Sequence, residues 1–314
     1  MFSRRFLRIK VVKAIYAHIN CPDDPIAAKE RALLQGIDKA YDLYPLILSL
    51  IVEVKRYAEE RQEIAMRKHL PTEADLNPNR KFVNNALVAQ MEADEALDDM
   101  LTSRRLGWGS YPELIRHLYQ KMTASEYYTD YMASERKSYA EDRRMVEEFF
   151  LQTVQDDAML LDILEDSSIM WSDDIDYIMI MVMRTLGSCK ASQEVFPLLP
   201  QYKSEEDAAF VRRLFGLAAA GYGDHLSILE SYTRNWDVER IAVMDNVILT
   251  TALAELMGFE SIPVKVTLDE YIEIAKYYST LGSSNFINGI LDKITTDFTA
   301  NGRINKQGRG LVEF

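Results

Sequence analysis

The first residues of the chain carry a dense run of basic side chains. Residues 3–16 read SRRFLRIKVVKAIY and contain no acidic residue, although the whole protein has a formal net charge of −13. In a helix, cations of the first turn face the positive end of the helix dipole, which costs roughly 0.3–1 kcal/mol each. A bound phosphate offsets that cost, because a helix N-terminus offers unpaired N–H groups and arginine makes bidentate hydrogen bonds to phosphate. The stretch therefore indicates a phosphate-binding helix start capped by Ser3, and its candidate ligands are Arg4, Arg5, Arg8, Lys10 and Lys13.

The same stretch also has a structural interpretation. At about 100° per residue, one apolar stripe runs along the helix, formed by Leu7, Val11, Ala14 and Ile15. Arg8 falls at the edge of this stripe, where it could instead pair with a carboxylate. Lys10 and Lys13 lie on the far side, where solvated surface charge is the alternative to a phosphate contact. Arg4 and Arg5 are therefore the leading candidates for contact with phosphate.

A second candidate site lies where the last predicted helix begins, in the segment GSSNFING at 282–289. One of its serines is the expected helix cap. Its phenylalanine offers a flat face to an unstacked base, and its asparagines offer hydrogen bonds to that base. The structural alternatives are that the phenylalanine belongs to the core and that the second asparagine bonds only to the helix start. The candidate contacts are Ser283, Ser284, Asn285, Phe286 and Asn288.

Residue patterns typical of catalysis are absent from the sequence. There is no glycine-rich phosphate loop, no pair of cysteines at metal-binding spacing and no His-Glu-x-x-His motif, and the four histidines are scattered. The acid pairs at 156–157 and 173–174 could hold a metal or act in acid–base chemistry, but in an acidic stretch such pairs are typically surface residues or helix caps. We therefore expect no enzyme activity, no cofactor and no metal site.

The acidic charge is concentrated in the middle of the chain. Residues 91–176 hold 21 acidic and 8 basic residues, so this segment alone has a net charge of −13. The remainder is balanced, and the total charge does not argue against a nucleic-acid partner. The two cysteines are far apart and cannot form a disulfide framework, and the apolar run at 45–54 is about half the length of a membrane span. We expect a cytoplasmic protein with no membrane contact.

Apolar spacing predicts an all-α protein. Residues recur at intervals of three and four, and strand alternation is hard to find. Helix starts are signalled by Asp24 with Pro25, by Ser204 with Asp207, and by Thr267 with Glu270. Proline and glycine mark linkers at 69–79, 104–112 and 187–203.

An internal repeat is found when the chain is compared with itself. Residues 141–186 match residues 206–251 without a gap at a shift of 65 positions. Most identical pairs are apolar core positions, such as Phe150 with Phe215. The simplest meaning is a duplicated three-helix unit, and the alternative is chance agreement between amphipathic helices.

The C-terminal part resembles the NusB transcription antitermination family. The resemblance rests on Trp236 with Glu239 and Arg240, on Asp245, on ELMGFESIPVKVTLDEYIEIAK at 255–276 and on NFINGILDK at 285–293. The opening RRFLRIKVVKAIY is similar to the family's arginine-rich first helix. The family implies two small helical bundles. We therefore expect a first helix at 1–20, an acidic helical insertion with the degenerate repeat at 21–204, a C-terminal bundle at 205–300 and a flexible basic tail at 301–314.

The resemblance also implies a function. Family members bind the single-stranded boxA element of ribosomal RNA leaders together with NusE, a small-subunit ribosomal protein, and help RNA polymerase ignore terminators. In the family the RNA is held by the start of the first helix, here Arg4, Arg5 and Arg8, and by the turn entering the last helix, here 282–289. Where many members have an acid and a lysine in that turn, this chain has Gly282 and Asn285, which puts one phosphate contact in doubt.

Other functions compete with this one. A non-catalytic protein-interaction scaffold would use the basic start to bind an acidic partner or the acidic middle of the chain. The NusB-like domain of a ribosomal RNA methyltransferase would need a catalytic domain after residue 300, where this chain stops. The insertion is expected to be a spacer or a protein-docking surface, and its KFVNN at 81–85 resembles NFING at 285–289 only weakly.

Overall fold

The computed structural model describes residues 1–171, 173–193, 195–233 and 242–311. Across these residues the secondary structure is helical and contains no strand, which confirms the all-α prediction. The chain divides into two compact units, one formed by residues 1 and 38–201 and the other by residues 2–37 and 202–314. We call them unit 1 and unit 2. Within the described part, no helix has both the length and the apolar character needed to cross a membrane.

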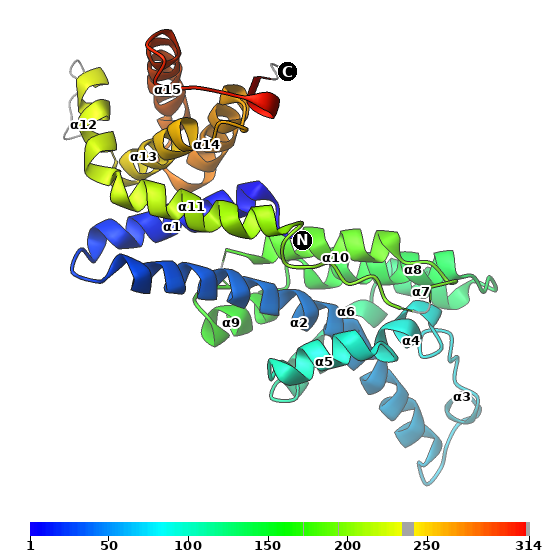
Figure 1. Cartoon of the computed structure of the whole chain (residues 1–314). Helices are drawn as coiled ribbons and strands as arrows, with labels where there is room; N and C mark the ends of the chain where they lie inside the picture. Colours follow the sequence, from blue (N-terminus) through cyan, green and yellow to red (C-terminus); the bar gives the residue numbers. More distant parts are fainter. Residues whose placement is uncertain (172, 194, 234–241, 312–314) are drawn as a thin grey trace. The chain divides into compact units, whose positions relative to one another are not determined.

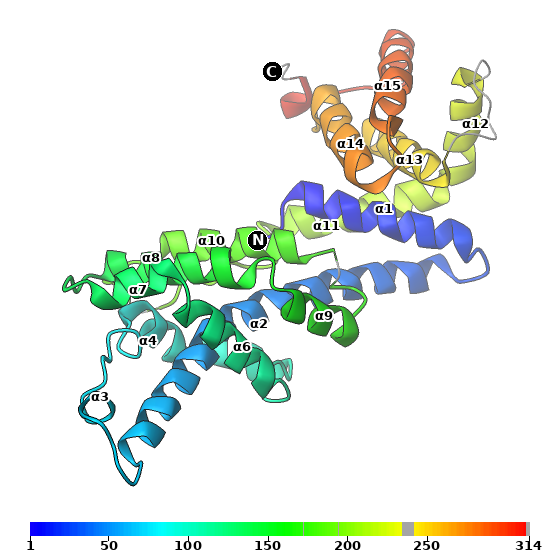
Figure 2. The same ribbon diagram turned by 180° about the vertical axis from the view of Figure 1, so that it is seen from behind.

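Unit 1 is assembled from short helices and most of one long helix (Figures 1 and 2). Helix α8 packs against α4, α7 and α10, and the π-helix η1 that continues it packs against α6. Six of its helices begin with a side-chain cap, given by Thr72, Asn85, Asp94, Ser125, Ser138 and Asp157. The elements are α2 (Ile26–Met66, from residue 38 on), α3 (Glu73–Leu76), α4 (Ala86–Glu92), α5 (Glu95–Ser103), α6 (Pro112–Thr123), α7 (Glu126–Ala133), α8 (Tyr139–Glu148), η1 (Phe149–Val154), α9 (Ala158–Ser167) and α10 (Ile175–Ser188).

Unit 2 is built around a central apolar helix, α13. This helix packs against α1, α11, α12, α14 and α15, so nearly all of its faces are covered. A helix that is apolar all round is stable only when it is buried in this way. The elements are α1 (Arg4–Asn20), the start of α2 up to residue 37, α11 (Glu205–Ala220), α12 (Tyr222–Tyr232), α13 (Val243–Gly258), α14 (Val264–Tyr278), α15 (Ser283–Ala300) and the 3₁₀ helix η3 (Gly308–Leu311).

The internal repeat corresponds to matching sets of helices in the two units. At the 65-residue shift, α8 with η1 falls on α11, α9 falls on α12, and α10 overlaps α13. Equivalent threonines also make equivalent bonds: Thr185 Oγ1 donates to Met181 O at 3.0 Å, and Thr250 Oγ1 donates to Asn246 O at 2.8 Å. The helix boundaries of the two segments therefore agree with the predicted three-helix repeat, which stays a prediction. Trp236, which pairs with Trp171 in the repeat, lies outside the described residues.

Several predicted helix boundaries need correction. Helix α14 begins at Val264 rather than at Thr267, and Thr267 is buried inside it. Ser204 does precede α11, but its side chain makes no capping bond. The linker predicted at 69–79 contains the short helix α3, which begins with a capping box between Thr72 and Asp75.

The C-terminal segment is docked on unit 2. Lys306 Nζ donates to Leu256 O at 2.9 Å and to Phe259 O at 2.8 Å, and so satisfies carbonyls at the end of α13 that have no partner within the helix. Burial lowers the pKa of Lys306 to about 8. The prediction of a flexible tail is therefore wrong for residues 301–311, and residues 312–314 lie outside the described part.

Candidate nucleic-acid interface

The start of α1 has the cap that its sequence predicts. Ser3 is the N-cap, and its Oγ accepts a hydrogen bond from the backbone N–H of Phe6 at 3.2 Å. The first turn contains no acidic side chain to neutralise the helix dipole. The N-terminus of α1 therefore keeps the positive electrostatic character that attracts anions.

Arg4 reaches from α1 to α11. Its Nε donates to Asp207 Oδ1 at 2.8 Å, a second nitrogen lies 3.9 Å from Glu206, and its guanidinium lies 5.3 Å from the ring centre of Phe210. The side chain remains 40% exposed while that of Asp207 is 7% exposed. Arg4 is thus held in place by one buried carboxylate and still presents part of its side chain to solvent.

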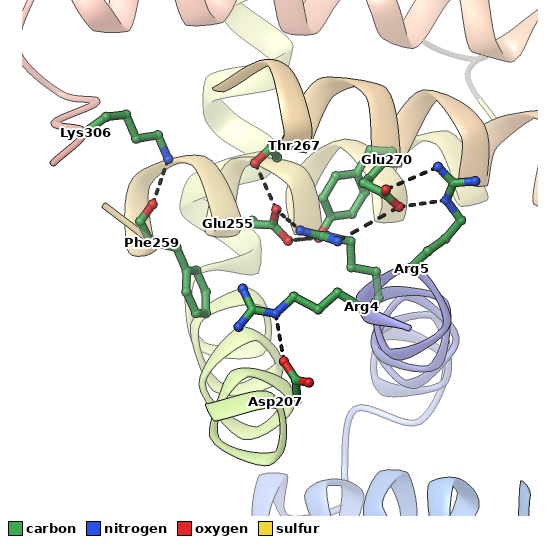
Figure 3. Close-up of polar contacts among 10 residues, drawn as sticks. Arg4, Arg5, Asp207, Glu255, Phe259, Thr267, Glu270 and Lys306 are labelled. Carbon is green, nitrogen blue, oxygen red and sulfur yellow. Dashed lines mark hydrogen bonds and ion pairs between the residues drawn. The ribbon is translucent and has the colours of Figure 1, made fainter. Parts of the chain in front are cut away.

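Arg5 reaches to the opposite side, toward α14. Its Nε and Nη2 donate to the two carboxylate oxygens of Glu270 at 2.8 and 3.2 Å, and its side chain is 43% exposed (Figure 3). Arg4 and Arg5 therefore diverge from one helix start, each held by a carboxylate on a different helix. Because both arginine side chains remain partly exposed, a phosphate can reach each of them.

Arg8, in contrast, is buried in the core of unit 2. Its Nε and Nη2 donate to Glu255 at 2.7 and 2.8 Å, and the two side chains are 2% and 0% exposed. Thr267 Oγ1 and Tyr271 OH donate to the same carboxylate at 2.9 and 3.2 Å. Burial alone would lower the pKa of Arg8, but the nearby Glu255 carboxylate outweighs it and raises that pKa. The prediction that Arg8 contacts RNA is therefore wrong, and Arg8 is a structural residue. Its place at the edge of the apolar stripe had left pairing with a carboxylate as the alternative.

The two lysines of α1 also differ from their predicted positions. Lys10 is buried, and its Nζ lies 5.1 Å from the ring centre of Phe6, so it is not solvated surface charge. Lys13 is half-buried, with Nζ 4.9 Å from the ring centre of Tyr278 at the end of α14. The predicted far side of α1 is covered as well, because Ile9 and other residues outside the apolar stripe are also buried.

The turn into α15 is built around Asp245 of α13. Ser283 Oγ donates to Asp245 Oδ2 at 2.9 Å, and Ser279 Oγ donates to the other oxygen of the same carboxylate. Ser283 is buried and is the first residue of the helix, so the predicted serine cap is wrong. The N-cap is Gly282, at φ 92°, and no side chain caps the helix. Ser283 is therefore committed to holding the turn.

The other candidates in this turn are more accessible. Asn285 and Asn288 are exposed, whereas Ser284 and Phe286 are half-buried. The exposed amides can form hydrogen bonds with a base or a phosphate. The ring of Phe286 is half-buried, so part of it remains accessible to a base.

Sequence reasoning missed the carboxylates that organise the arginines. It assigned Asp207 and Glu270 to helix capping, but they pair with Arg4 and Arg5. Their only sequence signal was an acid at a regular position in the first turns of predicted helices. Nothing in the local sequence links them to a helix more than 200 residues away.

Gly282 offers a direct test of this turn. An alanine there meets no atom within 4 Å, but the positive φ costs about 1–2 kcal/mol for a residue with a Cβ. We expect Gly282→Ala to lower the free energy of unfolding by about that amount in urea titrations. Gly289→Ala is the matched control, because Gly289 is an exposed helical position with free space around it, where alanine adds about 0.5–1 kcal/mol. A stabilising Gly282→Ala would contradict the assigned turn geometry.

The features noted in unit 1 have structural roles. Asn85, the last residue of the KFVNN echo, is fully buried and caps α4 through the N–H groups of Leu87 and Val88 at 3.0 and 3.1 Å. Asp157, from one of the acid pairs, caps α9 and accepts a hydrogen bond from Lys121 at 2.9 Å. Among the described residues, no cluster of histidine, cysteine and carboxylate side chains could hold a metal ion.

Comparison with known proteins gives matches to one family. The NusB family model matches residues 188–296. The transcription antitermination protein NusB of Salinibacter ruber is 37% identical over 138 residues, which cover 42% of this chain and 86% of that protein. The proteins of the same name from Chloroherpeton thalassium and Symbiobacterium thermophilum are 41% and 39% identical over 85 and 95 residues.

The matched part is a fraction of this chain. The Chloroherpeton thalassium match covers 27% of this chain and 40% of the relative, and the Symbiobacterium thermophilum match covers 30% and 62%. No solved structure matches the chain. This chain is longer than the region that it shares with these relatives, consistent with an extra region. Because it is 37% identical to a relative of which it covers 86%, the chain belongs to the NusB family.

Proposed function

We propose that the protein is an RNA-binding transcription antitermination factor. It binds boxA-type single-stranded RNA of ribosomal RNA leaders together with NusE, and it acts in the cytoplasm on the RNA polymerase elongation complex. Its membership of the NusB family supports this role. The observation that carries the proposal is the pair Arg4 and Arg5, whose side chains are 40% and 43% exposed at the capped N-terminus of α1.

Binding is proposed to exchange one anion for another at this helix start. In the free protein, Asp207 and Glu270 hold the two arginines in extended positions on either side of α1. A phosphate group can accept two parallel N–H···O bonds from each arginine, and it also gains from the positive N-terminal end of the α1 dipole. The exposed amides of Asn285 and Asn288 provide further bonds on the same unit.

Unit 1 is proposed to be a spacer or a protein-docking surface without catalytic activity. It contains the acidic segment 91–176, whose charge repels RNA. Its copy of the repeat, residues 141–186, matches residues 206–251 of unit 2 and therefore does not include a counterpart of the arginine-rich start of α1. RNA binding is therefore assigned to unit 2.

Gel-shift titration of the full chain tests the proposal. We expect tighter binding of a short boxA-type RNA than of a scrambled RNA of equal composition, and tighter binding still when NusE is present. Equal and very weak binding of both RNAs, even with NusE, would refute it. Partners captured from lysate before and after ribonuclease treatment then separate this role from a protein scaffold, whose partners would survive the nuclease.

A further inference from the structure

The C-terminal end of α14 presents an aromatic side chain that is not among the RNA contacts proposed above. Tyr277 is 80% exposed and, within the described part of the chain, takes part in no hydrogen bond, ion pair or ring contact. The next turn carries Leu281, which is fully exposed. Single exposed apolar residues are common on protein surfaces, so the position of Tyr277 has to carry the argument.

That position is in line with Arg5. Seven residues separate Glu270 from Tyr277 on α14, which is close to two helical turns, so both side chains lie on one face. Glu270 is the carboxylate that holds the Arg5 guanidinium. By helical rise, Tyr277 lies roughly 10 Å along α14 from that ion pair. A short single strand with a phosphate at Arg5 can therefore reach the ring with a following nucleotide.

The surroundings of the ring favour a polyanion. Lys13 of α1 lies over the neighbouring Tyr278, with its Nζ 4.9 Å from the ring centre. Lys276 precedes Tyr277, is exposed and pairs at the surface with Glu273, and the exposed Asn285 follows at the start of α15. The surface between Arg5 and the start of α15 thus combines cations and amides with one exposed ring. Proteins that bind single-stranded nucleic acids combine a cationic groove with exposed aromatic rings in this way.

We propose that Tyr277 is a stacking platform for one unstacked base of the single-stranded RNA, placed between the phosphate contact at Arg5 and the turn into α15. The proposal rests on the proposed function and adds to it a base contact outside the two predicted segments. Stacking on an aromatic face requires no particular base. Tyr277 therefore contributes affinity for single strands rather than discrimination between sequences.

Substitutions at Tyr277 in the full chain test this role, with a boxA-type RNA as the probe and NusE present. Loss of one stacking contact is expected to weaken binding by roughly 5- to 150-fold in Tyr277→Ala. Tyr277→Phe keeps the ring and should bind like the wild type. Tyr277→Leu keeps an apolar side chain without the aromatic face and should resemble Tyr277→Ala. Because stacking releases no counterions, the dependence of log K on log salt should be unchanged in all three variants.

A fluorescent base provides a second readout. RNAs in which 2-aminopurine replaces one base at a time should show a single position whose fluorescence is quenched by the wild type and not by Tyr277→Ala. Wild-type affinity in Tyr277→Ala, with clear RNA binding by the wild type, overturns this inference and leaves the proposed function intact. If the wild type itself fails to bind RNA, both are overturned. Unchanged RNA affinity with weakened NusE binding in Tyr277→Ala assigns the ring to a protein contact and also overturns the inference.

Discussion

Glu255→Gln is expected to destabilise unit 2 by up to about 3–5 kcal/mol, because it removes the carboxylate that pairs with the buried Arg8 and leaves only Glu270, 3.9 Å away, as a counter-charge among the described residues. Glu255 and Arg8 are 0% and 2% exposed, and the carboxylate also accepts hydrogen bonds from Thr267 and Tyr271. The network ties α1, α13 and α14 together at the centre of the unit. Domains are stable by only about 5–15 kcal/mol, so the loss is a large share of the total. Urea titration followed by circular dichroism measures it.

Glu273→Gln is the matched control for this variant. It makes the same chemical change on α14, but Glu273 lies at the surface and pairs with Lys276. Ion pairs of this kind contribute about 0–1 kcal/mol. If Glu255→Gln and Glu273→Gln differed by less than about 1 kcal/mol, the Arg8–Glu255 pair would not be the buried centre of unit 2.

The helical architecture could be predicted because its signals are local. Apolar spacing of three and four residues, and the linkers at 104–112 and 187–203, depend on neighbours within a few turns. The repeat could be found for the same reason, since each copy preserves its own core positions at a fixed shift. These features need no knowledge of which helices meet.

The partners of the arginines could not be predicted, because they depend on contacts between distant helices. Arg8 and Glu255 are separated by 247 residues in the sequence. The helical wheel could only place Arg8 beside the apolar stripe, where both a carboxylate and a phosphate were open partners. The choice was decided by α13, which brings Glu255 under α1 in the core of unit 2.

The start of α15 shows how tertiary contacts can override a local signal. Serine is a favoured helix cap, so Ser283 and Ser284 both fitted the pattern. In the structure Asp245 accepts a hydrogen bond from the hydroxyl of Ser283 at 2.9 Å, and the N-cap position is taken by Gly282. The docked segment at 301–311 has the same origin, since the carbonyls that bind Lys306 belong to the end of another helix.

Replacing both exposed arginines of α1 should weaken RNA binding and reduce its salt dependence. Each phosphate contact to a single strand contributes about 0.7 to the slope of log K against log salt, so Arg4→Ala/Arg5→Ala should reduce the slope by about 1.4. At 0.1 M salt this corresponds to a loss of roughly 25-fold in affinity, which shrinks as salt is raised. Fluorescence anisotropy with a labelled boxA-type RNA at several salt concentrations measures both quantities.

The control for this variant removes the same charge elsewhere. Arg67 and Arg212 are also exposed and pair with Glu63 and Glu30. Arg67→Ala/Arg212→Ala therefore leaves the net charge of the chain the same as in the α1 variant, without touching the start of α1. Equal effects of the two double variants would mean that RNA responds only to net charge, and the assignment of the site to α1 would be wrong.

Removing the charge of a carboxylate that holds one of these arginines should instead strengthen RNA binding. Asp207→Asn removes the charge that competes with phosphate for Arg4, while the amide oxygen can still accept the hydrogen bond that orients it. We expect RNA affinity to rise several-fold at low salt, and the gain to disappear when Arg4 is also replaced by Ala. A gain that persisted without Arg4 would come from the net charge alone. Lower affinity in Asp207→Asn would mean that Arg4 must stay paired with Asp207 in order to bind RNA, which would contradict the exchange of carboxylate for phosphate at the start of α1.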